Sequence, residues 1–413
     1  MNVRWAMGAW ILAAFGGCAD PGSAPGPPPE HVLVGVTVID GTGAASMPDQ
    51  TIEITNGRIS AIRPTERGEE GTVNVAGSFV TPGLIDAHVH LPADRLGAAL
   101  DSMLTLGITS TRQMSASPDP TQHLSDADSS QFTRLYRSAA WAGLTYMRDD
   151  LRVRDAYAAD GTDPLLLAVT DTTDLDAALQ AARERGASGI KIFSDLNPPL
   201  VRAIAASAHD AGLHVWSHAA VFPTKPSAVA ESGVDVISHA AFFVWEGPAE
   251  LPTTYNGPHP WNPFGPAAPY STVSHDDPAI VAVLETMRDR RVILDPTITV
   301  MTLLSEESRT WAVHLTRLAH EMGVRIAAGT DNFLLFDEIE ALVNDVGLTP
   351  LQAIASGTSI GAAAIGVEGD FGSLEVGKVA DLVVYRADPS IDITALRRPS
   401  HVFRGGSLVR PRQ

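Results

Sequence analysis

The middle of the chain alternates short apolar runs with amphipathic stretches whose apolar positions recur every three to four residues. Such a pattern predicts buried strands alternating with helices. Strands are expected at 108–114, 134–140, 190–193, 214–218, 234–239, 292–294 and 325–329. Helices are expected at 93–106, 174–186, 199–211, 225–233, 278–290 and 308–322. The alternation predicts an α/β fold with a (β/α) barrel.

Both ends of the chain carry β patterns. Strands are expected at 32–40, 51–55, 59–62 and 73–80, and again at 382–385, 401–403 and 408–409. Asn56-Gly57 is a good hairpin turn between two of them. We expect the two ends to pair into one small β-sandwich, with parts at 32–82 and 366–413, around an inserted barrel at 83–365.

The N-terminus has the pattern of an export signal. Arg4 precedes an apolar run at 5–15 that is too short to span a bilayer. Small residues then lead to Cys18, which resembles a bacterial lipoprotein signal, although Phe15 stands where Leu is usual. We expect a signal peptide at 1–17, lipidation of Cys18, and a proline-rich tether at 18–31. The protein would then be periplasmic or in the cell envelope, held to the membrane by its lipid alone.

Net charge and cysteine content exclude some classes of function and structure. The 413 residues carry a formal net charge of −19, which argues against nucleic acid because phosphates would be repelled. Cys18 is the only cysteine, so an internal disulfide is excluded. With 45% hydrophobic and 19% charged residues, the composition is that of an ordinary globular protein.

Two histidines close one apolar run near the start of the barrel. His88 and His90 lie in a stretch at 80–91 that reads as a buried strand. Residues two apart in a strand point to the same side, so the two imidazoles can bind one divalent metal. An isolated pair would more often be satisfied by backbone carbonyls, but later segments add further ligands.

Four more candidates lie in or at the ends of later strands. A lysine inside an apolar strand is rarely buried alone, so Lys191 is either salt-bridged or a carbamate that can bridge two metals. His218 and His239 end two strand candidates, at the barrel edge where active sites lie. Asp331 follows the last strand, where it can ligate a metal or exchange a proton with water. Taken singly, each has an ordinary structural explanation; together they predict a metal-dependent hydrolase.

A stretch rich in proline and aromatic residues, 242–277, directly follows the His239 strand. Barrel enzymes form their pockets from loops at that end. The stretch is therefore either a substrate lid or a packed surface excursion.

These motifs, in this order, resemble the amidohydrolase superfamily, and most of all its imidazolonepropionase-like and Xaa-Pro dipeptidase branch. The resemblance covers about residues 32–410 and is specific only in combination. It depends on TPGLIDAHVH at 81–90, GITSTR at 107–112, Lys191, His218, His239, GTD at 329–331, GLTP at 347–350 and the segment at 372–382.

The resemblance implies a distorted TIM barrel, the (β/α)8 fold, and a metal centre. His88, His90 and Asp331 would hold one ion, His218 and His239 a second, and carbamylated Lys191 would bridge them. Zinc is the default, with manganese, cobalt or iron also suitable. A metal-bridging hydroxide would attack an amide carbonyl, with Asp331 moving the proton to the leaving nitrogen.

Alternatives remain open at this point. A mononuclear lactamase-like, imidazolonepropionase-like or deaminase-like enzyme would make Lys191 structural, and an inactive ligand-binding lipoprotein would need no full ligand set. Gln113 stands where the family usually has Asp or Asn, which bears on substrate identity. Dipeptides, N-acyl amino acids and other small amides all suit the chemistry, and oligomeric state is not readable.

Overall fold

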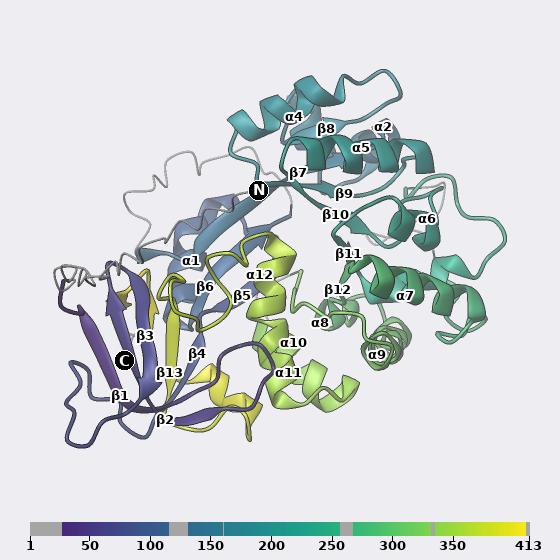
Figure 1. Cartoon of the computed structure of the whole chain (residues 1–413). Helices are drawn as coiled ribbons and strands as arrows, with labels where there is room; N and C mark the ends of the chain where they lie inside the picture. The colour runs from purple at the N-terminus through teal and green to yellow at the C-terminus, as the bar shows by residue number, and fades with distance from the viewer. Residues whose placement is uncertain (1–26, 115–130, 160, 257–266, 332–334, 410–413) are drawn as a thin grey trace, which may run out of the picture.

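The computed structural model of the 413-residue chain describes residues 27–114, 131–159, 161–256, 267–331 and 335–409 (Figure 1). The predicted signal at 1–17 and its lipidation site Cys18 lie outside these residues. No helix within the described ranges is both long and apolar enough to cross a membrane.

The two chain ends pair into one mixed sheet of seven strands, in the order β15-β14-β13-β4-β1-β2-β3. The link between the ends is β4, which runs parallel to β1 and antiparallel to β13. Asn56 and Gly57 have φ of 52° and 72°, as the expected hairpin turn between β2 and β3 requires. The strands are β1 (His31–Val38), β2 (Met47–Thr55), β3 (Arg58–Pro64), β4 (Phe79–Pro82), β13 (Leu382–Tyr385), β14 (Pro399–Arg404) and β15 (Ser407–Val409).

The second sheet is the barrel, and its strands are parallel. Their order is β5-β6-β7-β9-β10-β11-β12, with β8 paired to β7. They are β5 (Leu84–Val89), β6 (Ile108–Gln113), β7 (Arg134–Ala142), β8 (Leu166–Ala168), β9 (Gly189–Ile192), β10 (His214–His218), β11 (Val236–Ser238) and β12 (Ile293–Asp295). The distorted barrel beside a second sheet domain is thus confirmed.

The segment 325–329, expected as the last strand, connects β12 to β5. Leu294 N donates to Arg325 O at 2.9 Å, and Ala87 N donates to Ala328 O at 3.1 Å. These bonds bring both edges of the barrel together through a segment whose only strand pairing with the described part of the chain is the single bridge between Leu294 and Ile326. The short pairing places residue 331 directly beside β5.

Helices surround the barrel strands in Figure 1. Several begin at residues whose side chains accept a hydrogen bond from the first turn, such as Asp174, Asn197 and Ser305. They are α1 (Leu96–Thr105), α2 (Leu144–Asp149), α3 (Arg154–Ala159), α4 (Leu175–Glu184), α5 (Pro198–Asp210), α6 (Pro226–Glu231), α7 (Pro278–Arg290), α8 (Ile298–Met301), α9 (Glu306–Glu321), α10 (Leu335–Ala341), α11 (Pro350–Ser356) and α12 (Ser359–Ile365). The polar stretch at 149–163, whose sequence has no clear period and allows a loop or a partial helix, contains the short helix α3.

Candidate active site

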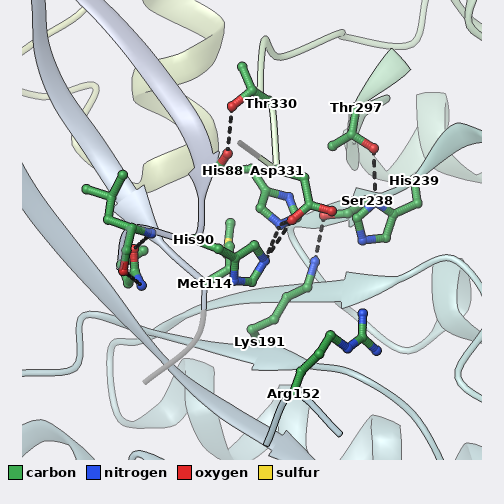
Figure 2. Close-up of polar contacts among 12 residues, drawn as sticks. His88, His90, Met114, Arg152, Lys191, Ser238, His239, Thr297, Thr330 and Asp331 are labelled. Atoms are coloured by element: carbon green, nitrogen blue, oxygen red, sulfur yellow. Dashed lines mark hydrogen bonds and ion pairs between the residues drawn. The ribbon is translucent and has the colours of Figure 1, made fainter. Parts of the chain in front are cut away.

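His88 lies near the C-terminal end of β5, His90 directly follows the strand, and the two side chains face one another (Figure 2). Their Nε2 atoms are 3.3 Å apart and their ring centroids 5.3 Å apart. His88 is fully buried, whereas the His90 side chain is 31% exposed. The two imidazoles therefore share one side of the strand, as their spacing predicts, with His90 toward the open side.

Asp331 comes to the same place from the other edge of the barrel. Its backbone N–H donates to His88 O at 2.9 Å, which fixes the turn that follows the closing segment. Its Oδ1 lies 2.8 Å from His90 Nε2 and 3.5 Å from His88 Nε2. Asp331 has φ of 56°, an unfavourable conformation for a residue other than glycine. Strain of this kind is often found at functional sites.

His218 ends strand β10, and His239 directly follows the neighbouring strand β11. Their ring centroids are 4.7 Å apart, and both side chains are buried. His239 Nδ1 is paired with Thr297 Oγ1 at 2.9 Å, so its Nε2 is the atom left to face the cluster. Potential ligand atoms of His88, His239 and Asp331 all lie within 4.8 Å of one another.

Lys191 extends from β9 into the floor of this cluster. It is fully buried, and its Nζ donates to Ser238 Oγ at 2.8 Å. No carboxylate among the described residues lies within salt-bridge distance of that nitrogen, so a salt bridge does not explain its burial. Burial lowers the pKa of Lys191 to about 8, which increases the share of neutral amine near physiological pH.

The electrostatics of the cluster favour ligand forms. Burial lowers the pKa of His218 and of His239 well below the usual range, so both imidazoles are neutral. Burial alone would raise the pKa of Asp331, but the adjacent His90 and His88 hold it well below its usual range. Neutral imidazoles and an ionised carboxylate are the forms that bind a divalent cation.

The donor set fits a divalent metal centre. His218 Nδ1 is buried, and within the described part of the chain it has no hydrogen-bond partner. A buried nitrogen left unsatisfied costs free energy unless a ligand occupies it. Together with His88, His90, His239 and Asp331, it supplies the nitrogen and oxygen ligands that zinc and related ions prefer.

Asp295, at the end of β12, is a site residue that sequence reasoning missed. Its Oδ2 lies 2.6 Å from His88 Nδ1, and neither side chain is exposed. A carboxylate on the far nitrogen of a metal-binding histidine fixes its tautomer and ring orientation. The signal was present, because Asp295 follows an apolar run just as His239 does.

Glu338 on α10 is a second missed residue, and it acts at a distance. Its carboxylate accepts hydrogen bonds from Ile298 N, Thr299 N and Thr299 Oγ1, each at 2.8 Å. These bonds hold the start of α8 just after Thr297, whose φ is 50°. Glu338 thereby fixes, from outside the barrel, the segment that holds the Thr297 hydroxyl group against His239.

A cavity of about 380 Å³ opens beside the cluster. Its size suits a small molecule. Phe242 and Tyr255 from the stretch predicted as a lid line it, which favours the lid interpretation over a surface excursion. The other lining residues are His90, Tyr146, Arg152, Val153, Phe193, His218, His239, Val300, Met301, Leu303 and Asp331.

The structure also locates Gln113 and His214. Gln113, where the family pattern differs, accepts from Leu91 N at 2.8 Å and donates to Leu91 O at 3.2 Å, so it fixes the chain just after His90. His214 starts β10 and pairs with Ala363 O at 3.1 Å, at the opposite end of that strand from His218. His214 therefore lies away from the cluster.

Comparison with known proteins gives one family match and a set of similar folds. Residues 264–409 match the model of the amidohydrolase family. A 73-residue segment is 33% identical to an adenine deaminase from Chelativorans sp. (strain BNC1). That segment is 17% of this chain and only 12% of the deaminase, so the chain aligns with a small part of that relative.

Solved structures resemble nearly the whole chain. A Xaa-Pro dipeptidase with bound methionine has a TM-score of 0.71 at 22% identity, covering 92% of this chain and 99% of the other. Ochratoxinase from A. niger has a TM-score of 0.72 at 18% identity, covering 94% of this chain and 97% of the other. A prolidase in complex with N-methylphosphonate-L-proline has a TM-score of 0.69 at 21% identity, covering 92% of this chain and 99% of the other. With the family match, these folds confirm the predicted resemblance to the amidohydrolase superfamily.

Proposed function

We propose that this chain is a metal-dependent amidohydrolase that cleaves a carbon–nitrogen bond of a small amide substrate. The observation that carries the proposal is the convergence of His88, His90, His239 and Asp331 beside a cavity, which the last three of them line. An inactive binding barrel would have no need for this set of ligands, and the family match supports a hydrolase.

In the proposed centre, His88, His90 and Asp331 would hold one divalent ion and His218 and His239 a second, and a carbamate on Lys191 would supply a further oxygen ligand. The carbamate forms when the neutral Nζ adds to carbon dioxide and releases one proton. Bound ions of this kind polarise a carbonyl oxygen and make water more acidic. The burial of Lys191 without an acidic partner supports the carbamate.

Asp331 is the proposed proton carrier. Its side chain is 21% exposed on the cavity side, so a carboxylate oxygen can accept a proton from the attacking water. The same oxygen then gives the proton to the leaving nitrogen, and the hydrolysis balances as one water added across the bond. His90, 2.8 Å from Oδ1, keeps the carboxylate in position.

A mononuclear enzyme is the second candidate. The three side chains whose ligand atoms lie within 4.8 Å, His88, His239 and Asp331, include histidines from both proposed ion sites. A single ion bound to these three would leave Lys191 as a structural donor to Ser238, and lactams or deamination substrates would then be the first to test.

Export as a lipoprotein stays part of the proposal. It depends on the apolar run at 5–15 followed by Cys18. Labelling with a radioactive or clickable fatty acid in a bacterial host tests it, because Cys18→Ser should abolish the label if Cys18 is the acylated residue.

The decisive experiment measures metal per chain on protein lacking residues 1–30, prepared with bicarbonate and zinc or manganese, together with hydrolysis of dipeptides and N-acyl amino acids. We expect about two ions per chain and turnover that falls at least about a hundredfold in Asp331→Asn, whose melting temperature stays close to that of the parent. About one ion would favour the mononuclear enzyme. No metal under any condition, or unimpaired turnover in Asp331→Asn, would contradict the proposal.

A further inference from the structure

Arg152 is a cation beside the cluster to which the proposed chemistry gives no role. It lies between α2 and α3 and lines the cavity together with His90, His218 and Asp331. Among the described residues that line this cavity, it is the only lysine or arginine. Figure 2 shows its guanidinium group on the cluster side of its main chain.

A buried carboxylate fixes one edge of this guanidinium. Arg152 Nε donates to Asp150 Oδ1 at 2.8 Å, and Nη2 donates to Asp150 Oδ2 at 2.7 Å. The Asp150 side chain is 2% exposed, whereas that of Arg152 is 43% exposed. Since the pairing occupies the edge formed by Nε and Nη2, the Nη1 end is directed away from Asp150. Asp150 therefore neutralises the guanidinium on one edge only, and 43% of the Arg152 side chain stays exposed.

Two tyrosines fix the guanidinium plane. Nη2 also donates to the Tyr146 hydroxyl at 3.1 Å, and the guanidinium carbon lies 5.5 Å from the centre of the Tyr255 ring. An arginine whose plane is set in advance loses little side-chain entropy when it binds a planar anion. This arrangement is the one expected of an anchor for a carboxylate.

The cavity wall between these charged groups is largely apolar. Phe193, Phe242, Val300 and Met301 line it. A molecule that fills it would place one polar end at the metal-ligand cluster, a second polar end at Arg152, and apolar groups against these side chains.

We infer that Arg152 binds a carboxylate of the substrate, so that the enzyme acts on N-acyl amino acids or dipeptides with a free carboxylate and an apolar side chain. The inference rests on the proposed function, because it assigns a carboxylate-binding group to the other end of the cavity in which the amide is cleaved. Arg152 is here a specificity-determining residue, and the cleaved bond lies at the other end.

Binding of a ligand that cannot be hydrolysed separates this inference from the activity. Hydrocinnamate and its neutral counterpart, hydrocinnamyl alcohol, are titrated calorimetrically into metal-loaded protein and into protein stripped by a chelator. We expect the carboxylate to bind at least about tenfold more tightly than the alcohol in both forms. In Arg152→Met the preference should disappear from the stripped protein, where no metal can bind the carboxylate.

Two further variants test whether a lost preference is due to the missing Arg152 guanidinium itself. Arg152→Met leaves the buried carboxylate of Asp150 without its cationic partner, so Asp150→Asn/Arg152→Met is measured beside it and should also lose the preference. Arg148→Met, an exposed arginine on α2, is the matched control and should keep it. Equal binding of acid and alcohol to the parent protein, no binding of either at millimolar concentration, or a preference that survives the loss of Arg152 would overturn the inference. Failure of hydrolysis alone would bear on the proposed function instead.

Discussion

Asp295 and His88 are 207 residues apart in the chain, yet their side chains meet at 2.6 Å between Oδ2 and Nδ1, with both fully buried. The pairing leaves His88 Nε2 directed at Asp331 and His90. A carboxylate and a metal-binding histidine in this relation form a supporting pair whose loss weakens metal binding.

Asp295→Asn should therefore lower metal affinity by about 10–100-fold. The asparagine oxygen can still accept from Nδ1, but it carries no negative charge to make the imidazole a better ligand. Competition against a chromogenic chelator measures the affinity. Because Asp295 Oδ1 has no hydrogen-bond partner among the described residues, the metal-free variant should melt no lower than the metal-free parent. An unchanged metal affinity would show that the pair is only structural.

Lys191→Ala should reduce metal content from about two ions toward one, with partial recovery when short carboxylic acids are added. A small carboxylate can occupy the space left by the missing carbamate. Metal analysis after dialysis, with and without acetate or propionate, provides the measurement. Lys378→Ala is the control, because Lys378 binds Ser373 in the other sheet domain. A Lys191→Ala protein with two ions and full activity would exclude the carbamate.

Gly329→Ala should disrupt the site although it adds only a methyl group. The new Cβ would lie 2.2 Å from Asp295 Oδ1 and 2.7 Å from His88 Cβ. Both neighbours are buried and cannot move away freely, so we expect a loss of about 1–3 kcal/mol in unfolding free energy together with reduced metal affinity. Gly97→Ala is the matched control, because its Cβ meets no atom within 4 Å. Equal melting temperatures for the two variants would contradict the packing argument.

Asp195→Asn should change the pH dependence of stability. Burial, followed by the charges of Asp149 and Asp150, raises the pKa of Asp195 to about 6 although its Oδ1 accepts from Tyr255 N at 2.7 Å. A raised pKa in the folded state gives stability that is fully present below the unfolded value, near 4, and is lost as pH rises through about 6.

The asparagine cannot titrate, so the variant should gain melting temperature relative to the parent as pH rises from about 4 to about 7. Differential scanning fluorimetry on metal-free protein measures this difference, and contributions from other groups cancel between the two proteins. A constant difference across that range would show that Asp195 stays ionised throughout.

Much of the barrel and of the site was predictable from local pattern. Strand candidates ended at His218 and His239, and the structure places both histidines at one edge of the barrel, because parallel strands present their C-terminal ends together. His88 and His90 share a side because side chains in a strand alternate. At 325–329 the expected strand is reduced to one bridge, and the segment still leads to Asp331 beside His90.

Other features depended on which distant elements meet. No sequence pattern near Asp295 predicts its contact with His88, because that contact exists only once the barrel closes through 325–329. Glu338 likewise acts on Thr299 because α10 packs against α8. The sequence by itself determined the barrel, the second sheet domain and the six candidate ligands, through periodicity and strand ends. Tertiary structure alone decided the supporting carboxylates and the position of Arg152 in the cavity, because hydrogen-bond partners and pocket walls are set by packing between segments far apart in the chain.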